Sequence, residues 1–366
     1  MRDIVPRVTT ETAQKSASAR LASLDIGRMA ACWYVMLFHA AIDVHVQNVV
    51  LSYGFSGVQF FMMLSGYVLA RPHLEAQPNR PFAMRRYVLG RVARILPPYY
   101  VVVLVAAAMA FLGHGSSVTP VPRAELPWHV FAHLAFIHTF FASTFHSIVS
   151  VLWSMGLECQ YYVVLPALLV AFRARRPLLV MAVVIVITIL TREALAAWLP
   201  DHGYLEQGFG LARLTEFGAG VALAALLGRG WSSKRVFGFA IVLGGLGFAS
   251  AAWRGGVFDE LRVQGVVLVA FAALRLFGPA VARGAGTRLL QLLGEASYST
   301  YLVHTLAGKT MLAGLGHLPA LATLGSGARV ALYALAGQVV GLGFYFVVEK
   351  PTTHWAGRLL GRPTHT

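Results

Sequence analysis

The sequence predicts an all-α protein that crosses a lipid bilayer about ten times. Of its 366 residues, 57% are hydrophobic and only 12% are charged, whereas soluble domains average roughly 25% charged residues. Apolar runs of about 17–25 residues, the length of helix that crosses the hydrocarbon core, recur along the whole chain. Because lipid offers the backbone no hydrogen-bond partners, these runs are expected to be helices.

Ten apolar runs reach this length, and they define one transmembrane domain over residues 23–350. The segment 129–145 is shorter and carries three histidines, and we expect a re-entrant or peripheral helix there. A full span in this segment would reverse every later loop and carry the arginines of 173–176 outward, although basic loops stay inside. The ten runs lie at 27–50, 54–71, 95–112, 147–172, 177–198, 211–228, 236–253, 261–279, 288–313 and 328–348.

Basic residues are shared unevenly between the two sides of this topology. The formal net charge is +15, but most arginines fall in loops on one side, which argues against nucleic acid as a partner. Six arginines lie between residues 71 and 94, and this loop is expected to face the cytoplasm. The polar segment 1–22 lacks a cleavable signal sequence, so we expect a disordered cytoplasmic tail there and a short cytoplasmic tail at 351–366. Cys32 and Cys159 cannot form a disulfide framework.

The first predicted span carries an arginine and a histidine eleven residues apart. Eleven residues make about three turns, so Arg28 and His39 share a helix face and lie roughly 16 Å apart along its axis. A titratable group deep in a bilayer is costly and often functional, and imidazole suits proton transfer near neutral pH. The alternative is a histidine that packs between helices and bonds to a neighbour.

A second pattern is a pair of arginines at the start of the third predicted span. Arg91 and Arg94 are three residues apart and therefore neighbours on a helix, with Arg85 and Arg86 close before them. Planar guanidinium groups at a membrane surface suit a phosphate ligand. Anchoring to anionic lipid is the alternative.

Two further patterns place polar side chains inside apolar runs. Ser154 and Glu158 are four residues apart, and a carboxylate in such a run must be paired, protonated or facing a cavity. Ser297, Tyr301 and His304 form one stripe, which must line a cavity or bond to another helix. A structural ion pair is the alternative role for Glu158.

Together these patterns resemble acyltransferase family 3, a family of integral-membrane acyltransferases. The resemblance covers about 320 residues and keeps the family order of motifs, although Met29 and Gln59 depart from the usual residues. The chain resembles the stand-alone type, without a C-terminal hydrolase-like domain. The matching motifs are Arg28 with His39, Gly57 to Tyr67, Arg91-x-x-Arg94 with Ile95 and Pro97, Trp153 to Tyr162, Ser297 to His304, and Glu349-Lys350-Pro351.

The resemblance implies transfer of an acyl group, often acetyl, from acyl-coenzyme A to a hydroxyl. The acceptor is commonly a sugar of a cell-surface or secreted polysaccharide, free or as a lipid-linked glycan, and sometimes a lipid or a macrolide. It also implies a bacterial inner (plasma) membrane protein with both termini in the cytoplasm, where coenzyme A is found. No metal cofactor is expected.

With the family in view, each polar residue is given a predicted role. His39 is the expected general base for the acceptor hydroxyl, oriented by Glu158 or by Asp43 one turn further on. A covalent acyl-His39 intermediate is the alternative mechanism. The remaining predicted site residues are Trp153, Ser154 and Tyr298, which shape the pocket or stabilise the oxyanion, and Arg28, Arg85, Arg86, Arg91 and Arg94, which bind the donor.

A different class of function also fits buried histidine and glutamate residues in ten spans. A proton-coupled transporter or flippase would place such groups near the middle of the membrane. The absence of an internal sequence repeat argues against this alternative. Release of coenzyme A thiol that depends on the acceptor separates the enzyme from the transporter.

Overall fold

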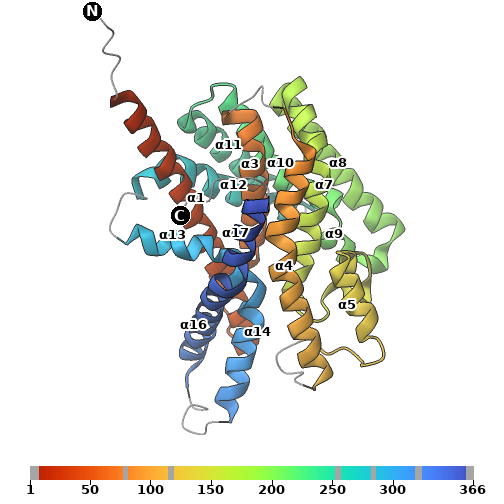
Figure 1. Cartoon of the computed structure of the whole chain (residues 1–366). Helices are drawn as coiled ribbons and strands as arrows, with labels where there is room; N and C mark the ends of the chain where they lie inside the picture. The colour runs from red at the N-terminus through yellow and green to blue at the C-terminus, as the bar shows by residue number, and fades with distance from the viewer. Residues whose placement is uncertain are drawn as a thin grey trace, which may run out of the picture.

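The computed structural model describes residues 8–76, 81–113, 119–251, 257–281, 286–317 and 324–359. These residues form a bundle of α-helices, with one isolated β-bridge between Thr119 and Ile148 (Figure 1). This confirms the predicted all-α fold of a polytopic membrane protein. The long helices are α1 (Val8–Val44), α3 (Ser56–Arg71), α4 (Met84–Phe111), α7 (Trp153–Ala174), α8 (Pro177–Trp198), α10 (Leu214–Gly228), α11 (Ser233–Ala251), α12 (Val257–Val281), α14 (Ser297–Gly316) and α16 (Ser326–Phe344).

Each of the ten predicted apolar runs overlaps one of these long helices. Within the described residues, six helical stretches are long and apolar enough to cross a membrane by length and composition. They include α3, α4, α7, α8, α10 and α16 with their short extensions. The chain is therefore an integral membrane protein, and the count of ten spans stays a prediction.

Shorter helical segments connect the long helices. Segment 129–145 is divided among α5 (Leu126–Leu134), the 3₁₀ turn His138–Phe140 and α6 (Ala142–Phe145), so it contains no helix that spans a bilayer, as predicted. The remaining short segments are α2 (Val49–Ser52), α9 (Tyr204–Gly208), α13 (Thr287–Glu295) and α17 (Lys350–Leu359), the 3₁₀ turns Tyr53–Phe55, Ser150–Leu152, Pro200–His202 and Gly210–Arg213, and the π-helical turns Pro72–Ala76 and Tyr345–Glu349.

Two histidines of segment 129–145 pack against each other inside this connection. The rings of His133 and His138 are stacked, with centroids 4.2 Å apart. Burial lowers the pKa of His133 to about 3 and that of His138 to about 4, so both rings are neutral near pH 7. Each ring has one nitrogen within hydrogen-bonding distance of a backbone carbonyl, which accounts for these two histidines as packing residues.

Both predicted tails are partly helical, which corrects the prediction of a disordered segment 1–22. Helix α1 begins at Val8, so residues 8–22 are not disordered. The segment is rich in alanine and other good helix formers and contains neither glycine nor proline. At the other end, α17 follows directly on the π-helical turn Tyr345–Glu349, so residues 351–359 are helical although Pro351 lies among them.

The predicted span 288–313 is also corrected, because two helices share it. Helix α13 ends at Glu295 and α14 begins at Ser297, and Figure 1 shows α13 lying across the bundle while α14 runs along it. The two helices part beside Gly294, which lies directly on α1. A Cβ at this glycine would lie 2.0 Å from the carbonyl oxygen of Asp25, so only glycine allows α13 to approach so closely.

Helices α3 and α10 cross at a second close contact, again through glycines. A Cβ at Gly66 would lie 2.2 Å from the carbonyl oxygen of Phe217, and one at Gly220 would lie 1.9 Å from that of Met63. Small residues let two backbones approach in a membrane, where close packing replaces the hydrophobic effect as the main attraction. This crossing fixes α3, which carries part of the candidate site.

We predict that Gly220→Ala destabilises the protein, because the added methyl group would meet a backbone oxygen that cannot move independently. The expected loss is about 1–3 kcal/mol, measured as a lower thermal unfolding temperature in detergent. Gly238→Ala in α11 is the matched control, since a Cβ there has no neighbour within 4 Å. The control should be neutral or stabilising. Equal unfolding temperatures for both variants would contradict the proposed crossing.

Candidate active site

Three arginines predicted to bind the donor lie around one cavity. Arg28 of α1 and Arg91 and Arg94 of α4 line it, together with residues of α3, α7 and α14. We call it the arginine cavity, and its empty volume is about 790 Å³. Its other lining residues are Val58, Phe61, Met62, Leu64, Ser65, Val68, Leu69, Ile95, Ser154, Met155, Glu158, Tyr162, Ser297, Tyr298 and Tyr301.

The remaining two predicted donor residues lie outside this cavity. Arg85 and Arg86 are exposed in the first turn of α4, before Arg91. The structure therefore separates the basic residues of this helix into an exposed group and a cavity-lining group. Arg28 is additionally held by an ion pair with Asp25, one turn earlier on α1. This pair fixes the guanidinium at the cavity wall.

Glu158 lies in the arginine cavity, and its hydrogen bonds are made there. One carboxylate oxygen accepts hydrogen bonds from the Ser65 hydroxyl at 3.0 Å and from the Tyr162 hydroxyl at 2.5 Å. The Arg91 guanidinium lies 5.9 Å from the centroid of the Tyr162 ring. The contacts of Glu158 therefore belong to the arginine side of the site.

Asp43, the other predicted partner of His39, also has contacts of its own. It accepts a hydrogen bond from the Tyr333 hydroxyl at 3.0 Å and forms an ion pair with Lys309 at 3.8 Å. Among the contacts of the described residues, neither Asp43 nor Glu158 bonds to the His39 ring. The structure thus gives both carboxylates other partners than the imidazole that they were expected to orient.

His39 lines a second and larger cavity. We call it the histidine cavity, and its empty volume is about 1890 Å³. It shares two lining residues, Val58 and Tyr301, with the arginine cavity, so the two spaces adjoin at these side chains. Its other lining residues are Val35, Phe38, Tyr53, Phe55, Gln59, His146, Trp153, Arg192, Gly203, Glu206, Gln207, Arg213 and Val263.

The three remaining predicted residues are divided between the two cavities. Ser154 and Tyr298 line the arginine cavity, whereas Trp153 lines the histidine cavity. The Tyr298 hydroxyl donates to the Ile95 carbonyl at 3.0 Å, and the Ser154 and Tyr301 hydroxyls are 2.6 Å apart. All three tyrosine and serine hydroxyls therefore take part in bonds within the protein.

Tyr301 lines both cavities, and His304, one turn further along α14, lies beside the His39 ring. The Tyr301 hydroxyl also bonds to the Val151 carbonyl at 3.1 Å, which ties α14 to the start of α7. The His304 ring lies 5.3 Å from the His39 ring and 5.7 Å from the Tyr301 ring, measured between centroids. Its Nδ1 is 2.7 Å from the Tyr301 carbonyl oxygen, and its buried Nε2 has no hydrogen-bond partner.

His304 was missing from the predicted site, although the polar stripe of Ser297, Tyr301 and His304 signalled it. In the structure, Ser297 lines the arginine cavity and Tyr301 lines both cavities. His304, at the end of the stripe, lies beside His39. Residue spacing predicted that the three side chains share one face of a helix, but it could not predict which helix packs against that face. The contact between α1 and α14 identifies that helix as α1.

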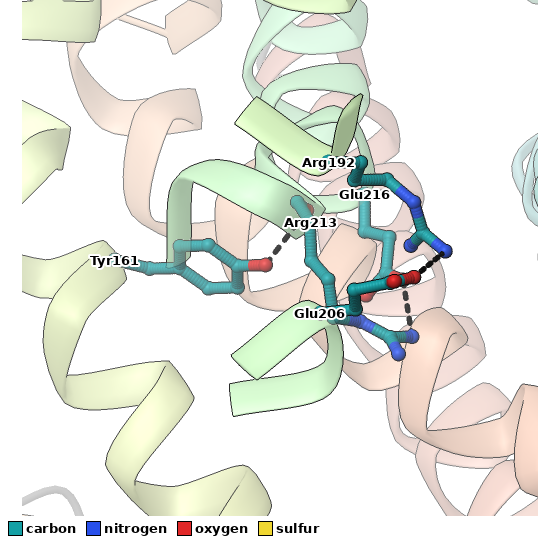
Figure 2. A network of polar contacts seen from close by, with 5 residues as sticks. All are labelled: Tyr161, Arg192, Glu206, Arg213 and Glu216. Carbon is teal, nitrogen blue, oxygen red and sulfur yellow. Dashed lines mark hydrogen bonds and ion pairs between the residues drawn. The ribbon is translucent and has the colours of Figure 1, made fainter. Parts of the chain in front are cut away.

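Three lining residues of the histidine cavity take part in two ion pairs, which Figure 2 shows. Arg192 of α8 pairs with Glu206 of α9 at 2.8 Å, and Arg213 pairs with the buried Glu216 of α10 at 2.5 Å. The Tyr161 hydroxyl donates to the Arg213 carbonyl at 2.7 Å. These five residues come from five separate elements, so the sequence alone did not reveal this wall of the cavity.

The arrangement suits transfer of a group between two ligands. One cavity concentrates fixed positive charge, as an anionic ligand requires, and the adjoining one presents an imidazole to a second ligand. Because the two cavities share Val58 and Tyr301, a reactive group bound in one has a short path to the other.

Comparisons with known proteins agree on the class of chemistry. The family model of an acyltransferase domain matches residues 21–348. The chain is 30% identical to the exopolysaccharide production protein ExoZ of Rhizobium meliloti over 86% of this chain and 94% of that protein. It is 25% identical to the peptidoglycan O-acetyltransferase OatA of Listeria monocytogenes over 44% of this chain and 26% of that protein. No solved structure matches the chain significantly.

Proposed function

The chain belongs to acyltransferase family 3, and on this basis we propose that it is a membrane O-acyltransferase acting from acyl-coenzyme A on a sugar hydroxyl of a cell-surface or secreted polysaccharide. Family membership makes it an acyltransferase, so the transporter alternative is not needed. The names of the two relatives, one in exopolysaccharide production and one a peptidoglycan O-acetyltransferase, support a glycan acceptor. Acetyl is the proposed acyl group.

The observation that carries the proposal is the adjoining pair of cavities. Coenzyme A is rich in phosphate, and Arg28, Arg91 and Arg94 offer planar donors to phosphate oxygens around one cavity. We assign the donor to this arginine cavity, with Glu158 holding the Tyr162 ring beside Arg91. The acceptor is assigned to the histidine cavity, and the thioester reaches it past Val58 and Tyr301.

In the proposed reaction, His39 removes the proton from the acceptor hydroxyl as its oxygen attacks the thioester carbonyl. The carbon–sulfur bond then breaks, and the thiolate of coenzyme A takes a proton from the imidazolium. The second route, in which the acyl group first bonds to a His39 nitrogen, uses the same cavities and the same residue. Arginine positions at the start of α4 support a cytoplasmic donor side and an inner-membrane location.

Replacement of His39 by alanine should abolish acyl transfer without loss of folding. Loss of a general base typically lowers the rate by 10²–10⁴-fold, and loss of a covalent nucleophile lowers it at least as far. Thiol release from acetyl-coenzyme A in the presence of acceptor measures the rate. His317→Ala, at the exposed end of α14, is the control and should keep wild-type activity. More than about a tenth of wild-type activity in His39→Ala would refute the assignment.

Replacement of both Arg91 and Arg94 by alanine should weaken binding of coenzyme A, measured by calorimetry in detergent. Lysine at either position should restore binding only partly, because lysine lacks the planar fork. The double variant Arg85→Ala/Arg86→Ala removes the same charge from the exposed start of the helix and should reduce affinity less. Equal losses in the two double variants would show a general charge effect, and no loss in either would favour lipid anchoring.

A further inference from the structure

The histidine cavity has a charged wall far from His39 along the chain. In this wall, the positive charges of the arginines are matched by carboxylates. Arg192, Glu206 and Arg213 all line the cavity, and each guanidinium has a carboxylate partner, at 2.8 Å for Arg192–Glu206 and in the buried Arg213–Glu216 pair. Figure 2 shows the two pairs lying close together. Because each guanidinium is matched by a carboxylate, the wall has no net positive charge to attract an anionic ligand, while its polar groups can still bond to neutral ones. The wall therefore favours a neutral ligand that has many hydrogen-bonding groups.

Aromatic side chains line the same cavity. Phe38, Tyr53, Phe55 and Trp153 contribute to it, and the Arg213 guanidinium lies 5.7 Å from the centroid of the Trp153 ring. Aromatic faces pack against the C–H faces of a sugar ring, while ionised groups bond strongly to its hydroxyls. A cavity that offers both kinds of contact matches an uncharged sugar better than an acyl chain or a charged head group.

The charged wall is held in place before any ligand binds. The Gln160 side chain of α7 donates to the Gly208 carbonyl and accepts from the Gly210 N–H, both at 2.8 Å. A Cβ at Gly208 would lie 2.5 Å from the Phe145 ring, so this segment also packs closely on α6. The segment that presents Glu206 and Arg213 is thus fixed to α7, and its side chains keep their geometry.

We propose that Arg192, Glu206 and Arg213 form the acceptor-recognition wall and that they select an uncharged sugar unit. This inference rests on the proposed function, because it assigns the acceptor to the histidine cavity. Sugar hydroxyls bond to the paired guanidinium and carboxylate groups, and the ring stacks on the aromatic side chains. Glu206 has a second effect, since it neutralises Arg192 and so prevents that arginine from attracting an acidic sugar.

The test compares acetyl transfer to matched neutral and acidic sugars. The probes are neutral tetrasaccharides of glucose, galactose or mannose and the tetrasaccharides of the corresponding uronic acids, with acetyl-coenzyme A as donor. The wild-type protein should acetylate a neutral probe with the higher kcat/KM. Glu206→Gln should raise KM for that probe about tenfold or more, as expected for a lost charge-assisted bond, and move the ratio of kcat/KM values toward the matching uronic acid.

Two further variants separate recognition from folding. Glu193→Gln changes the exposed neighbour of Arg192 on α8 and should match the wild type in both ratio and KM. Arg192→Gln/Glu206→Gln removes the pair but leaves the wall neutral, so it should bind neutral sugars more weakly without gaining the acidic ones. Affinity for coenzyme A should be unchanged in all three variants, which also verifies that they are folded.

Each outcome decides a different claim. A wild-type protein that acts better on the uronic acid probes, or equal effects of Glu206→Gln and Glu193→Gln, would overturn the recognition wall and leave the acyltransferase proposal standing. Acetyl transfer to none of the sugars by the wild-type protein would overturn both claims.

Discussion

The contact of Tyr301 with α7 is the interaction on which the rest of the site depends. Its hydroxyl bonds to the Ser154 hydroxyl and to the Val151 carbonyl, and its side chain lines both cavities. Polar groups inside a membrane protein need partners within the protein, because lipid supplies none. Through these two hydrogen bonds, Tyr301 joins α14 to the start of α7, and its side chain lies between the two cavities.

The two cavities differ in how their charge is arranged, and this difference matches two different ligands. Three arginines and one carboxylate, Glu158, line the arginine cavity, and only Arg28 among these arginines forms an ion pair there, with Asp25, among the described residues. In the histidine cavity, the two lining arginines are each paired with a carboxylate. An anionic donor and a neutral acceptor would therefore be sorted by electrostatics before any contact with the reacting atoms.

Local patterns in the sequence predicted much of this site, because helical spacing decides which residues share a face. Arg28, Arg91 and Arg94 were predicted to act together, and all three line one cavity. Spacing cannot tell which helices touch. The partners of Glu158 lie on α3 and one turn further along α7, and the ring beside His39 comes from α14. These contacts depend on tertiary packing between segments far apart in the chain.

The fold shows the same division between local and tertiary information. Hydropathy located the ten long helices, but it did not predict the break at Ala296, where α13 turns aside to lie on α1 through Gly294. Nor did it predict helix at residues 8–22, where polarity suggested a disordered tail although the residues favour helix. The wall of Arg192, Glu206 and Arg213 was missed because its residues come from three separate elements, the long helix α8, the short helix α9 and a 3₁₀ turn, which only tertiary packing brings together.

Transfer across sealed proteoliposomes tests the central claim, that donor and acceptor occupy two separate, adjoining cavities; we propose that the donor enters from the face where α4 begins and the acceptor from the opposite face. Labelled acetyl-coenzyme A is supplied on one face and the neutral sugar acceptor on the other, with the orientation fixed by labelling Ala83→Cys, at the exposed start of α4, with an impermeant thiol reagent. We predict labelled acceptor only when the donor is on the Ala83 face and the acceptor is on the opposite face. Transfer that requires both substrates on the same face would contradict the account.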